Sequence, residues 1–148
     1  MDSARAIENL LYTYAERIDA GDLDGVAALF EHATIFGQED GPPETQFVGV
    51  DGARKMYGMS TRIYEDDGTP KTKHVTTNAI IEVDEDAGTA TCRSYYCVVQ
   101  ATPVLPLQPI IAGRYRDTFA RHDDGSWWFA TRTMYVDLMG DLSQHLKW

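Results

Sequence analysis

The stretch KHVTTNAIIEVD, residues 73–84, marks the point at which the chain changes from a helical to an alternating pattern. It is rich in β-branched residues, which is typical of a β-strand. Similar segments follow at residues 89–101, 110–121 and 126–139, and the HDDG between the last two is typical of a hairpin turn. Three prolines in residues 102–109 predict that this connection lies outside the sheet. The second half of the chain is therefore expected to form a long antiparallel meander.

The first half of the chain has helical patterns. Residues 3–20 carry apolar side chains at the spacing of one helix face, and Gly21 follows as a natural stop. A second helix is expected over residues 23–30, and a third over residues 52–64 with Asp51 as its N-cap. Helices followed by strands indicate an α+β fold. Because the strands are long and carry aromatic residues on both faces, we expect a strongly curved, mainly antiparallel sheet that closes over the N-terminal helices as a conical barrel with a cavity.

Composition limits the possible partners. The 148 residues, 43% of them hydrophobic and without internal repeats, are enough for one globular domain spanning residues 1–148. A formal net charge of −10 argues against nucleic acid and anionic membranes as partners. The sequence has neither an apolar run that would span a bilayer nor a signal-peptide pattern. Cys92 and Cys97 are five residues apart in one predicted strand and point to opposite faces, so we expect reduced thiols and a cytoplasmic protein.

Two residues are candidates for acid–base chemistry. Asp19 falls in the last turn of the first helix, where the helix dipole disfavours a carboxylate, and it flanks the apolar face. His74 lies on a partly polar strand face together with Thr76, Asn78 and Ile80. A carboxylate beside a histidine fixes the tautomer of the ring and makes it a better base. Taken singly, each residue is better explained by a structural role, as a solvated helix-end acid or as a histidine bonded to a loop carbonyl.

Arg132 is the third candidate. It is predicted to share one face of the last strand with Trp128, Ala130, Met134 and Val136. An arginine in such a row needs a partner, because a buried unpaired charge is costly. If residues 124–125 form a two-residue turn, Asp117 lies directly opposite Arg132. Arg132 is therefore predicted to pair with Asp117 or to face a substrate, and the two roles are compatible.

Further side chains are expected to line the same cavity. Tyr14 lies on the inner helix face, five residues before Asp19, and a phenol supplies a hydrogen-bond donor at the end of an aromatic body. The expected wall, by strand parity, comprises Tyr95, Cys97, Ile111, Gly113, Tyr115 and Met134. Ordinary core packing is the better explanation for any one of them taken singly. Together they favour a cyclic, apolar substrate with one or two oxygens.

The opposite strand face suggests self-association. Strand parity places three aromatic residues on the convex side of the sheet: Trp127, Phe129 and Tyr135. That much exposed aromatic surface needs to be covered, either by a packed helix or, as we prefer, by a homo-oligomer formed through this face.

Several segments, in this order and spacing, resemble the SnoaL-like family of the nuclear-transport-factor-like superfamily. They are YAERIDAGD (residues 14–22), GVAALF (25–30), KHVTTN (73–78), GRYRDTFAR (113–121) and GSWWFATR (125–132). The resemblance covers nearly the whole chain. The family includes scytalone dehydratase, hexachlorocyclohexane dehydrochlorinase and bile-acid dehydratase. The resemblance implies a conical α+β barrel with one deep, mostly apolar pocket. It also implies a homo-dimer or homo-trimer.

The resemblance also implies roles for four residues. Asp19 and His74 match the family's aspartate and histidine, and Arg132 matches an arginine of the dehydrochlorinase and the bile-acid dehydratase. Tyr14 matches a tyrosine of the bile-acid enzyme. His74 would remove a proton from carbon while Asp19 holds its ring, and Arg132 with Tyr14 would stabilise an oxyanion or leaving group. The implied reaction is a cofactor-independent elimination or isomerisation of a steroid, polyketide or aromatic ring.

Other function classes remain open. Ile18 and Val99 stand where scytalone dehydratase has a tyrosine and a second pocket histidine, which argues against that particular dehydration. Because His32, His122 and His145 fall in no ligand spacing, we expect no metal. A non-catalytic small-molecule-binding module is one alternative. A small scaffolding subunit, resembling that of ring-hydroxylating dioxygenases, is another.

Overall fold

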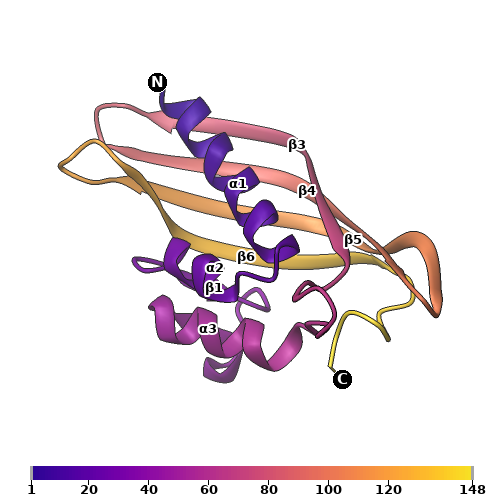
Figure 1. Ribbon diagram of the computed structural model, residues 1–148. Helices are drawn as coiled ribbons and strands as arrows, with labels where there is room; N and C mark the ends of the chain where they lie inside the picture. Colours follow the sequence, from indigo (N-terminus) through magenta and orange to yellow (C-terminus); the bar gives the residue numbers. More distant parts are fainter. Residues whose placement is uncertain (1, 148) are drawn as a thin grey trace.

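One six-stranded sheet, with a helix lying across one face, forms the centre of the molecule (Figure 1). The computed structural model describes residues 2–147. Its elements are α1 (Ser3–Asp19), α2 (Leu23–Leu29), β1 (Thr34–Phe36), a 3-10 helix (Pro43–Thr45), β2 (Gln46–Val48), α3 (Gly49–Ser60), β3 (Thr72–Asp84), β4 (Thr89–Thr102), β5 (Leu105–Arg121) and β6 (Trp127–Met139). The predicted α+β class is confirmed.

The strand order is β2-β1-β6-β5-β4-β3. All neighbouring strands pair antiparallel except β1 and β6, which are parallel. Helix α1 crosses the sheet from β3 towards β6, and α2 and α3 pack together beside β1 and β2 (Figure 1). The two edge strands, β2 and β3, are not paired with each other, so the sheet is a curved cone wall that hydrogen bonds do not close.

The end of α1 is fixed against the segment that leads into β3. The helix buries one face against the sheet, with Ile7, Leu11, Tyr14, Ala15 and Ile18 on it. Gly21 follows with a φ of +76°, and a Cβ atom there would lie 1.9 Å from the carbonyl oxygen of Gly68. A glycine is therefore required at residue 21 for this close approach. The packing brings Asp19, the last residue of α1, beside the start of β3.

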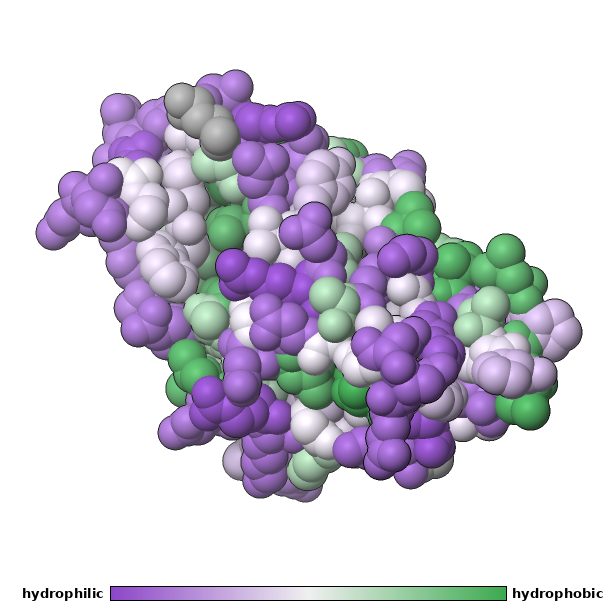
Figure 2. Space-filling model, viewed as in Figure 1, coloured by the Kyte–Doolittle hydropathy of each residue, from purple (hydrophilic) through white to green (hydrophobic). Residues whose placement is uncertain are grey.

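The prediction that the three prolines lie outside the sheet is correct for Pro103, which is in the turn between β4 and β5, but wrong for the other two. Strand β5 begins at Leu105 and contains Pro106 and Pro109. This part of β5 pairs only with β4, because β6 reaches no further along β5 than Ile111. A proline is tolerated where one edge of a strand is free. The same hairpin projects beyond β6 and exposes a group of hydrophobic residues that includes Val104 (Figure 2).

The predicted pairing of Asp117 with Arg132 is confirmed, but not by the turn that suggested it. Residues 122–126 form a longer loop, and a bulge at Ala130 restores the register, because Thr118 pairs with Thr131 whereas Phe119 pairs with Phe129. One extra residue turns the preceding side chains to the other face of the sheet.

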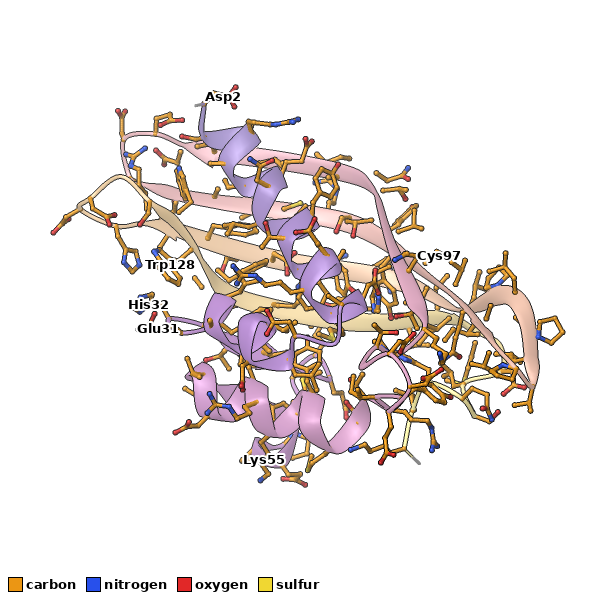
Figure 3. The ribbon with its side chains drawn as sticks, viewed as in Figure 1. Asp2, Glu31, His32, Lys55, Cys97 and Trp128 are labelled. Carbon is orange, nitrogen blue, oxygen red and sulfur yellow. The ribbon has the colours of Figure 1, made fainter. Side chains whose placement is uncertain are left out.

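The bulge corrects the expected faces of β6. Phe129 is fully buried and Trp127 is 7% exposed, so both lie in the core rather than on the convex side. Trp128, which was expected inside, instead contacts the ring of His32 near the β5–β6 hairpin (Figure 3). The core packs around three phenylalanine rings, of which Phe129 contacts Phe30 and Phe119 at centroid distances of 4.9 Å and 4.8 Å.

Helix α3 begins earlier than expected. Its N-cap is Val48, with no capping side chain, and it ends at Ser60 instead of residue 64. Asp51 is therefore not the N-cap but lies in the first turn of α3. Its negative charge there still interacts favourably with the helix dipole.

Candidate active site

A cavity of about 400 Å³ lies between α1, α3, the sheet and the C-terminal segment after β6. This volume is within the range of about 300–1,000 Å³ that is usual for small-molecule sites. Most of the wall is apolar and includes Val98, Ile111 and Met134 from the sheet. His74 and Tyr14 also line the cavity.

Asp19 and His74 are joined by two hydrogen bonds. The backbone N–H of His74 donates to Oδ2 of Asp19 at 2.7 Å, and Nδ1 of the ring lies 2.6 Å from Oδ1. The hydroxyl of Thr72 donates a third bond to Oδ1 at 2.8 Å. Both side chains are nearly buried, with His74 6% and Asp19 9% exposed. The structure thus brings together two residues that are 55 positions apart.

These bonds fix the tautomer of the histidine. Burial raises the pKa of Asp19, but the hydrogen bonds and charge of His74, helped by Thr72, outweigh it and hold this pKa below its ordinary value. An ionised carboxylate accepts hydrogen bonds only, so Nδ1 of His74 carries the proton. The lone pair is therefore on Nε2, which is the arrangement of a general base.

A pair of tyrosine hydroxyls lines the cavity beside His74. The hydroxyls of Tyr14 and Tyr57 are 2.8 Å apart and share one hydrogen bond. Burial, reinforced by Tyr14, raises the pKa of Tyr57 well above its ordinary value, so that phenol stays neutral. The Tyr14 ring also meets the His74 ring edge-on at a centroid distance of 6.3 Å. Because one O–H of this pair donates to the other oxygen, the pair has one O–H left to donate near the base.

Arg132 lies behind this wall and does not line the cavity. Its Nε and Nη2 donate to the two carboxylate oxygens of Asp117 at 2.8 Å and 3.0 Å, and both side chains are fully buried. Burial alone would lower the pKa of Arg132, but the charge of Asp117 raises it. The guanidinium carbon lies 3.7 Å from the ring centroid of Tyr115 and 4.5 Å from that of Tyr14. Arg132 can therefore act on the cavity only through these rings.

The expected wall residues divide into two sets. Ile111, Tyr115 and Met134 do line the cavity, whereas Gly113 is buried beneath Tyr96. The inward orientation expected for Tyr95 and Cys97 is wrong. Tyr95 is 54% exposed, and the residues that face inwards from β4 are Tyr96 and Val98.

The register of β4 explains this correction. Ser94 pairs with Tyr115 and Tyr96 with Gly113, and directly paired residues share a face. In the run SYYCVV, residues 94–99, both the odd-numbered and the even-numbered positions carry mostly apolar or aromatic side chains. The pattern of this run therefore does not distinguish the two strand faces. Arg93 is exposed and lies on the same strand face as Tyr95. Its charge is the sequence signal that could have identified this face as the outward one.

Strand β3 also contains a bulge. Its register with β4 shifts between Thr77 and Ile80, and Asn78 has a φ of +57°. Asn78 and Ile80 are consequently exposed, and they do not continue the face of His74 as expected. Only the first part of β3 contributes to the cavity wall.

Two further cavity residues were not predicted from the sequence. Tyr57 lies on α3 at helical spacing, where an aromatic residue is normally read as core. His145 lies beyond the last strand, in a tail without a clear pattern.

No cluster of three or more potential metal ligands occurs among residues 2–147. In that same range no helix is long and apolar enough to cross a membrane.

Comparison with solved structures gives several close fold matches. One is a variant of Rv3472 from Mycobacterium tuberculosis, described as a protein of unknown function, with 25% identity, a TM-score of 0.70 and coverage of 92% of this chain and 72% of that chain. Another, from Novosphingobium aromaticivorans, carries a provisional assignment as a scytalone dehydratase, with 25% identity, a TM-score of 0.70 and coverage of 93% and 86%. LinA has 20% identity, a TM-score of 0.69 and coverage of 95% and 90%, which shows a shared fold.

The sequence comparisons give the family. No curated protein sequence matches the chain. The family profile of the SnoaL-like domain matches residues 1–133, which is most of the chain. The predicted resemblance is thereby confirmed, and the protein belongs to the SnoaL-like family.

Proposed function

We propose that the protein is an enzyme that removes a proton from carbon in a cyclic, mostly apolar small molecule, and so catalyses an elimination or isomerisation without a metal or organic cofactor. The observation that carries this proposal is the bond between Asp19 and Nδ1 of His74 at the wall of a mainly apolar cavity. Membership of a family with dehydratase-like relatives supports it.

His74 is the base in this scheme. Its Nε2 takes the proton from carbon, and the imidazolium that forms is stabilised by the ionised Asp19 at 2.6 Å. Asp19 is not consumed. Its two contacts to His74 keep the ring in one position, which spares the reaction the cost of orienting the base.

Tyr14 supplies the complementary donor. Its hydroxyl, supported by that of Tyr57, donates a hydrogen bond to the oxyanion or leaving group that develops on the substrate. The buried guanidinium of Arg132 lies 4.5 Å from the centroid of the Tyr14 ring and contributes positive charge from behind. Arg132 is therefore a positioning residue that acts through Tyr14.

Proton abstraction can be tested with 5-nitrobenzisoxazole, a flat two-ring compound that opens when a base removes its ring C–H proton. The wild-type protein should accelerate this opening, and His74→Ala should lower kcat/KM by about 10²–10⁴-fold. His32→Phe is the matched control, because His32 is exposed and contacts Trp128 outside the cavity (Figure 3). Equal rates for wild type and His74→Ala would overturn the assignment of the base.

The cavity argues against the alternative of a scaffolding subunit. A subunit that only supports a partner needs no internal space, whereas about 400 Å³ remains open beside His74. The binding-module alternative predicts that a hydrophobic ligand such as 2-naphthol binds but that no variant of His74 changes a reaction rate. The benzisoxazole measurement separates that outcome from catalysis.

We also propose that the chain self-associates through the outer face of the sheet. Val75, Ile80, Tyr95 and Leu138 on this face are 44–70% exposed. This set replaces Trp127 and Phe129 as the reason for the proposal, because those two residues are in the core. Sedimentation of the wild type should show a dimer or trimer, and the double variant Tyr95→Glu, Leu138→Glu should sediment as a monomer. A monomeric wild type at micromolar concentration would contradict the proposal.

The proposed setting is the cytoplasm, with no nucleic-acid or membrane partner. Cys92 and Cys97 are both free, as their positions on opposite faces predict. The net charge of −10 gives the protein an overall repulsion from nucleic acids and anionic lipids.

A further inference from the structure

His145 is a second histidine of the cavity, and it comes from outside the sheet. It lies in the segment after β6 and lines the cavity together with His74. The centroids of the two rings are 6.0 Å apart, and the rings meet at an angle of 65°. His145 is 6% exposed, so it is a built part of the wall.

The segment that carries His145 is held firmly. The backbone N–H of Arg62 donates to the carbonyl of His145 at 2.8 Å, and that of Lys147 donates to the carbonyl of Ser60 at 3.0 Å. Thr61 and Leu146 form an isolated β-bridge. These contacts fix the C-terminal segment to the end of α3 and hold the imidazole at the cavity.

The ring of His145 has an unused hydrogen-bonding capacity. Its Nδ1 is fully buried without a hydrogen-bond partner among residues 2–147. Its Nε2 also makes no hydrogen bond to any of residues 2–147. Unlike Nδ1, however, Nε2 is not fully buried. Leaving a buried polar atom unpaired destabilises the folded state. Packing alone does not explain a histidine here, where a leucine or phenylalanine would cost less.

The burial of Nδ1 selects a tautomer. A buried N–H without an acceptor is rarer in proteins than a buried acceptor without a donor. The proton of neutral His145 is therefore placed on Nε2, where the cavity can satisfy it. His74 has the opposite arrangement, because its proton is on Nδ1 and its Nε2 is an acceptor. The cavity thus presents one imidazole acceptor and one imidazole donor side by side.

His145 stays neutral at physiological pH. Burial lowers the pKa of His145 to about 4, and the nearby His74 adds to this shift while Asp19 opposes it. A neutral imidazole is a good hydrogen-bond donor but a very weak acid, so it stabilises an oxyanion without giving up its proton.

We propose that Nε2–H of His145 donates a hydrogen bond to a carbonyl oxygen of the substrate, next to the carbon from which His74 removes a proton. This inference rests on the proposed function and narrows the substrate class to cyclic ketones. With the two ring centroids 6.0 Å apart at the same cavity, one substrate can place a C–H at His74 and the adjacent carbonyl at His145.

The step balances without any further reagent. His74 takes the proton, the C–H electron pair becomes the C=C bond of an enolate, and the carbonyl π pair moves onto oxygen. That oxygen accepts the hydrogen bond of His145, which keeps its own proton. The imidazolium of His74 then returns a proton to the same carbon, which exchanges it, or to another carbon of the enolate system, which isomerises the ketone.

The first test uses the wild-type protein. With ¹⁵N-labelled histidine at pH 7, the ring nitrogens of His145 should show the neutral tautomer with the proton on Nε2. On titration with 2-naphthol, a mimic of an enol, the Nε2–H resonance should move downfield. A proton on Nδ1, or an Nε2–H resonance that does not move at saturation, would overturn the proposal.

The second test follows exchange of the C1 protons of 2-tetralone, a two-ring ketone, in deuterated water. His145→Phe should slow the protein-catalysed exchange by about a hundredfold, and His145→Gln, which keeps an N–H donor, should recover part of the loss. His32→Phe is again the control. If the wild type exchanges but His145→Phe, folded by circular dichroism, exchanges equally fast, only the role of His145 is overturned. If the wild type gives no exchange above buffer, the base assignment itself is contradicted.

Discussion

The Asp19 carboxylate holds His74 at two points, accepting a hydrogen bond from its backbone N–H at 2.7 Å and another from its ring at 2.6 Å. One residue at the end of α1 thus fixes both the backbone at the start of β3 and the tautomer of a side chain on it. The unfavourable position of a carboxylate at a helix C-terminus is explained by this function of Asp19.

Asp19→Asn should leave the fold intact and impair catalysis. The amide cannot stabilise the imidazolium and presents an N–H that favours the wrong tautomer of His74, so kcat/KM for 5-nitrobenzisoxazole should fall by about 10²–10⁴-fold. Asp22→Asn is the matched control, because asparagine caps α2 as well as aspartate does. Wild-type activity in Asp19→Asn would show that the carboxylate does not assist His74.

Tyr14→Phe should reduce turnover while keeping the shape of the cavity. It removes the hydroxyl proposed to face the substrate and leaves that of Tyr57 without its partner at 2.8 Å. We expect kcat/KM for the same substrate to fall by about a hundredfold. In Tyr57→Phe, which keeps the Tyr14 hydroxyl, the loss should be smaller. The reverse order of the two variants would assign the donor to Tyr57.

The buried pair of Asp117 and Arg132 should behave as one unit in stability. Asp117→Asn leaves the fully buried guanidinium without a counter-charge, and we expect a loss of about 3–5 kcal/mol in the free energy of unfolding in urea. The double variant Asp117→Asn, Arg132→Met should lose less than the single variant. Additive losses would mean that the two charges do not depend on each other.

Stability should depend on pH through His145. Its pKa is about 4 when folded and 6.5 as the ordinary value, so between these values the unfolded chain binds a proton that the folded chain does not. The contribution of neutral His145 is therefore present above pH 6.5 and is lost as the pH falls towards 4, by up to roughly 3 kcal/mol.

This pH dependence can be measured as the difference in unfolding free energy between wild type and His145→Phe from pH 7 to pH 4. As the pH falls, the wild type should steadily lose stability relative to His145→Phe. Asp19 does not interfere with this measurement. Folding lowers its pKa, so the stability that the ionised carboxylate contributes is lost only below its ordinary pKa of 3.8. Parallel curves over this range would show that His145 titrates normally.

The sequence predicted the parts that local patterns determine. The α+β order and the meeting of Asp19 with His74 follow from helix periodicity and family likeness. The pairing of Asp117 with Arg132 was predicted from a two-residue turn that is absent, and the bulge in β6 restores it. Single-residue irregularities could not be predicted, because the bulge at Ala130 reverses the faces of Trp127 and Phe129 and only the paired structure reveals it.

The missed cavity residues have a different cause. His145 reaches the cavity only because the last segment returns to Ser60 and Arg62, a long-range contact without a sequence signature. In β4, both parities of the run around Tyr95 and Tyr96 are apolar, so hydrophobicity alone could not select the inward tyrosine.

The most direct test of the central claim is the kinetic isotope effect on opening of 5-nitrobenzisoxazole deuterated at the ring carbon that loses its proton. Removal of that proton by His74 in the slow step predicts a primary isotope effect of several-fold on kcat for the wild type. In His74→Ala, the protein-dependent rate and its isotope effect should both disappear. An isotope effect near unity together with an undiminished rate in His74→Ala would contradict the claim that Asp19 and His74 form a base for carbon acids.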